Sequence, residues 1–521
     1  MFLKKINRYS IYLILLLASI LRLWHLGRRD FWYDEAFTGI AVKESWTGMM
    51  EMIIKDVHPP LYYLTLKFFA TPFNYGVFGI RLFSVIFGIL CVWAVYLFTK
   101  ELFGRKSALY ASLIAAISPF AIQYSMEGRM YSMFSFFIIL AAYWLVKSLK
   151  VGKLALSEVE GLQKKYGHSI LFGIFLGLAA LTHYMGIIFT PIFYLIYVVW
   201  NYSKDDVLYD KFQVLSFKFQ EIVKRILPNK GIALGFLTAL VVFLPWIPNF
   251  IRHVARNVTS NSLDWIRPAN LGDIAVNIQM FIFGTPLGEM SSGMPGPNEF
   301  HGIADISMWI TVTIFITAVV LYLYRRVETP AYRQASLHAI LILSLGFMIL
   351  VWSLGFLGKY FFVARYLLPA GYFIFVLLGV WLARIRLPYS ALAIVFYVGL
   401  LSSVAPLGYS EGWNVFAKDL GKYRDKNFYI LNSFDYVIAK YYLGADRLTL
   451  YNVDWPSYNP DYWAAIGPSL KRTENLEDLK EDKSALIISN TQLNGQDNLN
   501  FDPTNLQLAA QYKNILLYKF Q

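Results

Sequence analysis

The chain has 521 residues, of which 57% are hydrophobic and only 16% are charged. A soluble protein carries about a quarter charged residues, so this composition excludes an ordinary soluble protein and indicates a polytopic membrane protein. The formal net charge of +13 does not predict nucleic acid as a partner, because membrane proteins collect positive residues in cytoplasmic loops. The single cysteine, Cys91, excludes an intrachain disulfide and does not identify the compartment.

Apolar runs long enough to cross a bilayer recur through residues 1–408 and predict an α-helical membrane domain with about eleven transmembrane helices. The basic N-terminus precedes an apolar run without a small-residue cleavage site, which favours an uncleaved first span over a signal peptide. The predicted spans are 9–26, 77–98, 107–124, 130–147, 169–183, 185–201, 231–250, 306–324, 337–357, 366–383 and 388–407.

Charge predicts how these spans are oriented. When the N-terminus is counted as cytoplasmic, every second loop is basic, as the positive-inside rule demands. We therefore expect a multi-pass protein of a plasma (inner) membrane with an extracytoplasmic C-terminal region. The outward-facing segments are then the loop 27–76, the turn 127–129, the stretch 252–305, the turn 358–365 and everything after about residue 408.

Two segments of the loop 27–76 read as short helices. Apolar residues recur at helical spacing in Ala36–Ile54, which predicts one or two amphipathic helices lying on the outer leaflet. Leu61–Phe73 is apolar but too short to span, so we expect it to dip into the membrane surface.

The tail, 409–521, is polar throughout and contains short apolar runs that alternate with helical patterns. This alternation predicts a small extracytoplasmic α/β domain. The predicted strands are Phe428–Leu431, Leu448–Val453 and Ala485–Ile488, and the predicted helices are Asp435–Leu443 and Leu476–Asp482.

An acidic pair, Asp34 and Glu35, follows Trp32 and Tyr33 at the outer end of the first span. Carboxylates at a membrane face are costly to desolvate without partners, which favours a functional role. The alternative is a solvated pair that flanks the positive end of a helix.

His58 precedes Pro59 and Pro60, whose fixed φ angles would hold the histidine in a set direction at the start of a helix. The alternative is an incidental histidine beside a helix start. Asp56 and His58 could also ligate a metal, although two ligands two residues apart are a weak indication.

Two further groups carry arginine at predicted outer turns. Glu127 and Arg129 either close a hairpin as a local ion pair, or Glu127 positions Arg129 toward a phosphate. Lys359 and Arg365 either snorkel to the interface beside a tyrosine belt or form a cationic pocket for a lipid phosphate. Arg81, at the outer start of the second span, could belong to that pocket or merely snorkel.

Taken together, these motifs resemble a known family. The acidic pair after the first span, His58-Pro59-Pro60-Leu61-Tyr62-Tyr63, the pattern Glu127-x-Arg129-x-Tyr131, and Ala364-Arg365-Tyr366-Leu367-Leu368-Pro369 occur in the order and topology of one group. They are similar to the GT-C glycosyltransferases of the protein O-mannosyltransferase and aminoarabinose-transferase type, the glycosyltransferase 39 group. The resemblance covers about residues 9–400 and implies the GT-C fold.

The resemblance implies an inverting transfer of a sugar from a polyprenyl-phosphate carrier to a lipid, glycan or protein hydroxyl on the outer face. Asp34 matches the catalytic aspartate and would act as the general base, while Glu35 would orient the acceptor or the sugar. His58 matches a basic position that touches the carrier phosphate. The other residues implied to bind the carrier phosphate or the sugar are Tyr62, Arg81, Glu127, Arg129, Tyr131, Lys359, Arg365 and Tyr366.

Such a reaction requires no redox cofactor, because a lipid phosphate is a good leaving group. Some relatives of the aminoarabinose type carry an acidic metal ligand just before the basic position, where this chain has Val57, so divalent metal use stays open. Hexosyl and pentosyl transfer both stay open.

Two other readings compete with a transferase. One is a lipid-linked sugar flippase or transporter, and the other is a polyprenyl-linked glycan ligase or polymerase. Transporters usually place ionisable residues in the middle of spans and often show internal repeats. Here the charged residues cluster at outer span ends and no repeat is seen, which favours an enzyme.

Overall fold

In the computed structural model, the described residues cover most of the membrane part and the core of the tail. They are 2–150, 158–202, 226–259, 266, 268–284, 317, 331–358, 360–386, 388–391, 394–395, 412–431, 433–444, 446–451, 471–473, 476–482, 484–489 and 505–520.

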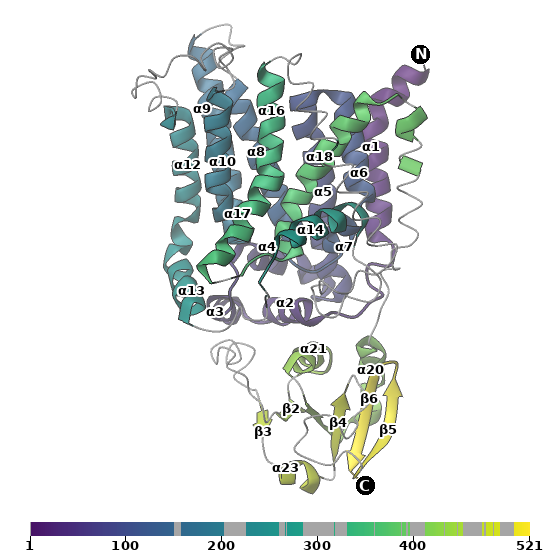
Figure 1. The fold of residues 1–521 in the computed structure, drawn as a ribbon. Coiled ribbons are helices and arrows are strands. Elements are labelled where there is room, and N and C mark those ends of the chain that lie inside the picture. The colour runs from purple at the N-terminus through teal and green to yellow at the C-terminus, as the bar shows by residue number, and fades with distance from the viewer. Residues whose placement is uncertain are drawn as a thin grey trace.

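A bundle of long helices forms the membrane part, and a sheet domain lies beyond one end of it (Figure 1). The bundle helices, with the short 3-10 and π segments between them, are α1 (Phe2–Leu23), α5 (Val77–Phe103), α6 (Arg105–Ile117), α7 (Pro119–Ser125), α8 (Tyr131–Lys150), α9 (Glu158–Thr182), α10 (Met185–Tyr202), α12 (Lys230–Phe243), η4 (Leu244–Trp246), α13 (Ile247–Thr259), α16 (Ala331–Leu341), η6 (Ile342–Gly346), α17 (Phe347–Ser353), η7 (Leu354–Leu357), η8 (Ala364–Leu367) and α18 (Leu368–Arg384).

Within the described residues, seven helices are long and apolar enough to cross a membrane, or eight if the bent pair α6–α7 is one span. A polytopic helical membrane protein is thus confirmed, whereas the count of eleven spans is not. The first predicted span contributes a shorter apolar helix, Tyr9–Leu23. Apart from residue 317, the predicted span 306–324 lies outside the described residues, as does most of 388–407.

The bend between α6 and α7 is 61° and begins where Pro119 follows Ser118. It leaves carbonyls at the end of α6 without helical partners. The buried guanidinium of Arg22 donates to two of these oxygens, those of Ala115 and Ala116, at 3.0 and 2.8 Å. A cation at the carboxyl end of a helix also stabilises its dipole, so Arg22 holds the bend.

Short helices lie across the end of the bundle that faces the sheet domain, here called the domain-facing end (Figure 1). They come from the loop 27–76 and from a later segment. They are α2 (Tyr33–Lys43), α3 (Trp46–Lys55), α4 (Leu61–Ala70), η1 (Thr71–Phe73) and α14 (Leu271–Phe283).

The segment Ala36–Ile54 falls in two helices, α2 and α3, as the helical spacing predicted. However, every residue of α2 from Glu35 to Val42 is buried, so α2 does not lie on a lipid surface. The reason is a second layer of protein, because α21 (Ser433–Leu443) of the tail packs on it.

The tail is an α/β domain, as predicted. Its single described sheet has the strand order β3-β2-β1-β4-β6-β5, in which β1 pairs in parallel with β2 and β4, β2 with β3, and β6 runs antiparallel to both β4 and β5. Its elements besides α21 are α20 (Trp413–Asp419), η9 (Leu420–Tyr423), β1 (Asn427–Ile430), β2 (Leu448–Tyr451), β3 (Lys471–Thr473), α23 (Leu476–Glu481), β4 (Ala485–Ser489), β5 (Leu506–Tyr512) and β6 (Ile515–Phe520).

The sheet domain is joined to the bundle by specific contacts. The carboxylate of Asp30 accepts hydrogen bonds from the backbone N–H groups at the start of α20, those of Gly412, Trp413 and Asn414. On α2, Gly39 leaves room for the ring of Tyr441, since a Cβ there would lie 2.5 Å from that ring. The domain is therefore docked directly on the helix that begins with Tyr33 and Asp34.

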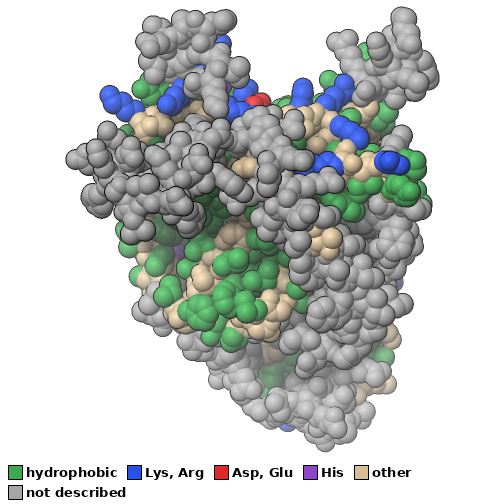
Figure 2. Space-filling view, turned by 45° about the horizontal axis from the view of Figure 1, so that its top comes forward, with side chains coloured by type: hydrophobic (Ala, Val, Ile, Leu, Met, Phe, Trp, Pro, Cys, Tyr) green, Lys and Arg blue, Asp and Glu red, His purple; other side chains and the backbone are tan. Residues whose placement is uncertain are grey.

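Lys and Arg side chains gather at the end of the bundle that carries the N-terminus, with hydrophobic side chains below them (Figure 2). That end includes the last turns of α5 and α8, with Lys100, Lys147 and Lys150. These lysines flank loops that the sequence predicts to be cytoplasmic, and the orientation itself stays a prediction.

Candidate active site

Asp34 lies in the first turn of α2, at the domain-facing end. Its side chain is 21% exposed, and its Oδ2 lies 4.0 Å from Nε of the buried Arg129. The backbone oxygen of Asp34 accepts a hydrogen bond from Nη1 of Arg129 at 3.2 Å. Among the described residues, no hydrogen bond occupies the Asp34 carboxylate, so it can accept one from a bound hydroxyl.

Glu35 has a different environment, although it is the next residue. It is fully buried, and its two oxygens accept three hydrogen bonds, two from Arg81 at 2.8 and 2.6 Å and one from the N–H of Gly128 at 2.7 Å. Burial raises the pKa of Glu35, but the charge and hydrogen bonds of Arg81 outweigh it and hold the pKa below its usual value. The carboxylate is therefore a charged anchor for α2 and for the turn at Gly128.

All five N–H groups of the Arg81 guanidinium donate hydrogen bonds to other residues of the protein. Its Nε and one Nη2 hydrogen go to Glu35, and the others go to the backbone oxygens of Leu26, Arg29 and Asp30. We expected Arg81 near a phosphate and Glu35 near the acceptor or sugar. The structure places both in a clamp beside Asp34 that shapes the loop from 26 to 35.

His58 links an acid to an arginine. Its Nδ1 lies 2.8 Å from Oδ2 of Asp56, and its Nε2 lies 3.3 Å from Nη2 of Arg129. A guanidinium only donates, so Nε2 accepts and the Nδ1–H donates to Asp56. Burial raises the pKa of Asp56, but His58 outweighs this and lowers it below its usual value. His58 thus orients Arg129.

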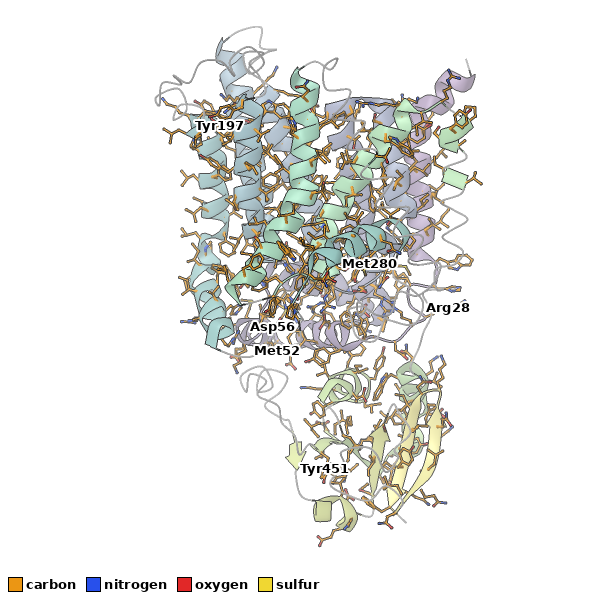
Figure 3. All side chains as sticks on the ribbon, viewed as in Figure 1. Arg28, Met52, Asp56, Tyr197, Met280 and Tyr451 are labelled. Carbon is orange, nitrogen blue, oxygen red and sulfur yellow. The ribbon has the colours of Figure 1, made fainter. Side chains whose placement is uncertain are left out.

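The two metal candidates, Asp56 and His58, contact each other. Within the described ranges, no group of three His, Cys, Asp or Glu side chains is close enough to hold a metal ion. The metal site stays a prediction. Figure 3 shows Asp56 at the domain-facing end, far along the bundle from Tyr197.

Arg129 joins several parts of the site. Besides Asp34 and His58, its guanidinium donates to Thr38 Oγ1 at 3.0 Å and to the hydroxyl of Tyr63 at 3.2 Å. The hydroxyl of Tyr62 instead reaches Ser84, which supports the backbone oxygen of Arg129. The tyrosine that contacts the guanidinium is therefore Tyr63, whereas Tyr62, which was expected to bind the carrier phosphate or the sugar, contacts Ser84.

Glu127 lies in the same turn and is buried. Its Oε2 has no hydrogen-bond partner among the described residues, and no ion pair joins its side chain to Arg129 there. Burial raises the pKa of Glu127 to about 7, against the attraction of Arg29. The hairpin-closing ion pair that the sequence allowed is thus absent from the described residues.

Arg365 enters the site from η8, just before α18. Its guanidinium lies over the rings of Trp32 and Tyr366, at 5.5 and 5.7 Å from the ring centroids. The ring of Tyr131 lies 6.3 Å from that of Tyr366. The turn at 127–131 and the start of α18 therefore meet opposite Asp34, as their order in the chain predicted. Lys359 lies outside the described residues.

Sequence reasoning missed contributions from two other segments. His183, in the two-residue break between α9 and α10, lies among the rings of His58, Tyr131 and Tyr366. On α13, His253 donates through Nε2 to the oxygen of Ile54 at 2.8 Å, and Arg256 donates to that of Asp56. The spacing of His253 and Arg256, three residues apart on one helix face, was the available indication.

Parts of the chain are similar in sequence to mannosyltransferases. The family model "Dolichyl-phosphate-mannose-protein mannosyltransferase" matches residues 57–217, a segment that includes His58, Glu127 and Arg129 but not Asp34 or Arg365. Two proteins of Bacillus subtilis (strain 168) are similar: "Putative mannosyltransferase YkcB", 29% identical over 96 residues, and "Putative mannosyltransferase YycA", 27% identical over 158 residues. These matches cover 18% and 28% of this chain, and only 13% and 22% of the length of the two relatives.

Nearly the whole chain is similar in fold to two membrane proteins of known structure. ArnT from Cupriavidus metallidurans bound to undecaprenyl phosphate superposes with a TM-score of 0.60 at 14% identity, covering 98% of this chain and 97% of that one. The oligosaccharyltransferase of Archaeoglobus fulgidus in its apo form gives a TM-score of 0.53 at 13% identity, covering 93% and 69%.

The protein therefore has the GT-C fold of membrane glycosyltransferases. The family match and the fold together confirm the resemblance to the mannosyltransferase and aminoarabinose-transferase type that the motifs indicated.

Proposed function

We propose that the protein is an inverting glycosyltransferase that moves a sugar from a polyprenyl-phosphate carrier to an acceptor hydroxyl. The observation that carries this proposal is the meeting of Asp34, whose carboxylate makes no hydrogen bond within the described part of the chain, with two buried guanidinium groups, Arg129 and Arg365. One base and one cationic cradle are what displacement of a lipid phosphate requires.

The displacement assigns a role to each group. The acceptor oxygen loses its proton to Asp34 and bonds to the anomeric carbon, while the carbon–phosphate oxygen bond breaks and its electron pair stays on the phosphate. Arg129 and Arg365 stabilise the charge that develops on that phosphate. Attack opposite to the leaving group inverts the anomeric centre. Glu35 and Arg81 act as positioning residues, and we propose that no cofactor is required.

A lipid-phosphate carrier is supported by the fold, since the similar ArnT structure contains undecaprenyl phosphate. The acceptor is a lipid, glycan or protein hydroxyl, and the transferred group is a hexosyl or pentosyl unit. We propose that the site faces outward from a plasma membrane with the N-terminus in the cytoplasm. The concentration of Lys and Arg at the opposite end of the bundle supports this orientation (Figure 2).

The test is transfer by the purified protein in lipid nanodiscs from a panel of synthetic undecaprenyl-phosphate sugars, with the anomeric configuration of the product read by NMR. We expect transfer with inversion from at least one donor and none from nucleotide sugars. Movement of the carrier across vesicle membranes without any transfer would overturn the proposal in favour of a flippase. Retention of configuration would overturn the single-displacement mechanism.

A further inference from the structure

His183 is a buried histidine that the mechanism above does not use. It is 5% exposed and lies between α9 and α10. Its ring stacks on Phe134 at a centroid distance of 5.3 Å and packs 4.8 Å from the ring of Tyr366. Packing against these two rings fixes the orientation of the imidazole, and with it the directions of Nδ1 and Nε2.

The protonated nitrogen of this ring follows from its backbone contact. The N–H of Met185 donates to Nδ1 of His183 at 3.2 Å, so Nδ1 is an acceptor and the proton of the neutral ring is on Nε2. Burial, with the nearby positive charges of Arg129 and Arg365, holds the pKa of His183 well below its usual value. The ring is therefore neutral and presents an Nε2–H group.

That Nε2–H group is buried and has no partner among the described residues. A buried donor without an acceptor is costly, and such groups in native proteins commonly mark a missing ligand. A second buried donor, Nε of Arg129, also makes no hydrogen bond within the described residues, although it lies 4.0 Å from Oδ2 of Asp34. The guanidinium groups that act on His183, those of Arg129 and Arg365, are cationic, so an acceptor bound between them and His183 is favoured when it is an anion.

We propose that His183 binds the phosphate of the polyprenyl carrier, with its Nε2–H donating to a phosphate oxygen beside Arg129. This inference rests on the proposed function and extends its phosphate site to the α9–α10 break. The donor carries a phosphodiester with one negative charge, and loss of the sugar leaves a phosphomonoester that can carry two. A hydrogen bond to the phosphate therefore strengthens as the bond breaks, so His183 contributes to the rate as well as to binding.

Three variants separate this role from a packing role. His183→Asn keeps an acceptor for the Met185 N–H but cannot reach the Nε2 position. His183→Gln places an N–H donor near that position. His168→Phe, within the helix α9 that precedes His183 and beside the ring of Trp144, is the control for an altered histidine outside the site. Thermal unfolding of each variant establishes that it folds.

Two quantities are measured in nanodiscs: the affinity for undecaprenyl phosphate, with inorganic phosphate as a competitor, and kcat with the donor that the wild type uses. We expect His183→Asn to lower kcat by about tenfold to a hundredfold and to weaken undecaprenyl phosphate binding, as loss of a hydrogen bond to a charged group does. His183→Gln should recover most of both, and His168→Phe should change neither. Competition by inorganic phosphate would show that the headgroup alone is recognised.

A folded His183→Asn protein with wild-type kcat and affinity would overturn the inference. If neither asparagine nor glutamine folds, His183→Phe, which keeps the stacking on Phe134, takes the place of asparagine under the same criterion. A wild-type protein that neither binds undecaprenyl phosphate nor transfers would instead overturn the proposed function itself, and that outcome is distinguishable from the first.

Discussion

Glu35 and Arg81 form a fully buried, two-pronged ion pair next to the proposed general base. Glu35 is adjacent to Asp34 in the chain, yet the two carboxylates have opposite surroundings. The carboxylate of Glu35 accepts hydrogen bonds from Arg81 and Gly128, whereas the carboxylate of Asp34 accepts none from the described residues. Of these two carboxylates, the one at Asp34 is thus available to a substrate.

Removing the charge of Glu35 tests this division of roles. We expect Glu35→Gln to lower the free energy of unfolding by about 3–5 kcal/mol, because it leaves the Arg81 charge buried without its partner. Thermal unfolding in detergent measures the loss, with Glu51→Gln, at an exposed position of α3, as the control. A Glu35→Gln protein that is as stable as the wild type but inactive would instead place Glu35 in contact with substrate.

The two buried glutamates predict opposite responses of stability to pH. The pKa of Glu35 is lowered on folding, so its contribution is present above its usual pKa of 4.5 and is lost as the pH falls below that. The pKa of Glu127 is raised to about 7, so the folded protein holds that proton more tightly and loses stability as the pH rises from 4.5 to about 7.

Glu127→Gln isolates the second effect. The variant should not lose stability between pH 4.5 and 7. At pH 8 its free energy of unfolding should exceed that of the wild type by at most about 3 kcal/mol. Melting temperatures of both proteins across this range measure the difference. Parallel curves for the two proteins would show that Glu127 titrates as it does in the unfolded chain.

The contacts of Asp30 predict that docking of the sheet domain affects the active site. Its carboxylate holds the start of α20, and its backbone oxygen accepts a hydrogen bond from Arg81. We expect Asp30→Ala to lower stability by about 1–2 kcal/mol, as loss of a helix cap does, to increase proteolysis near residue 412 and to reduce transfer. Asp425→Ala, at an exposed position of the same domain, is the control. Unchanged transfer with a released domain would show that docking is not needed for catalysis.

Much of the fold was predictable because long apolar runs have few alternatives in a membrane. The helices α5, α8, α9 and α10 fall on predicted spans, and β1, β2 and β4 fall on predicted strands. The burial of α2 was not predictable, since it depends on α21, which lies about 400 residues later in the chain. The strand β5 was missed because most of its side chains are exposed or half-buried. The strand β6 was also missed, although its apolar residues Ile515–Tyr518 are buried and were visible in the sequence.

The site was predictable at the level of motifs rather than of side chains. The segments around Asp34, His58, Arg129 and Arg365 do converge. Within a motif, however, neighbouring residues diverge by about 100° around a helix, so the sequence does not say that Tyr63 rather than Tyr62 reaches Arg129. His183 belongs to no motif, and only the fold brings it to the site.

The most direct test of the account is sugar transfer by Asp34→Asn compared with the wild type, together with carrier binding by both. Asparagine keeps the size of the side chain but cannot take a proton from the acceptor. We predict that transfer falls by about a hundredfold or more while undecaprenyl phosphate still binds. An Asp34→Asn protein that transfers as fast as the wild type would contradict the assignment of Asp34 as the base.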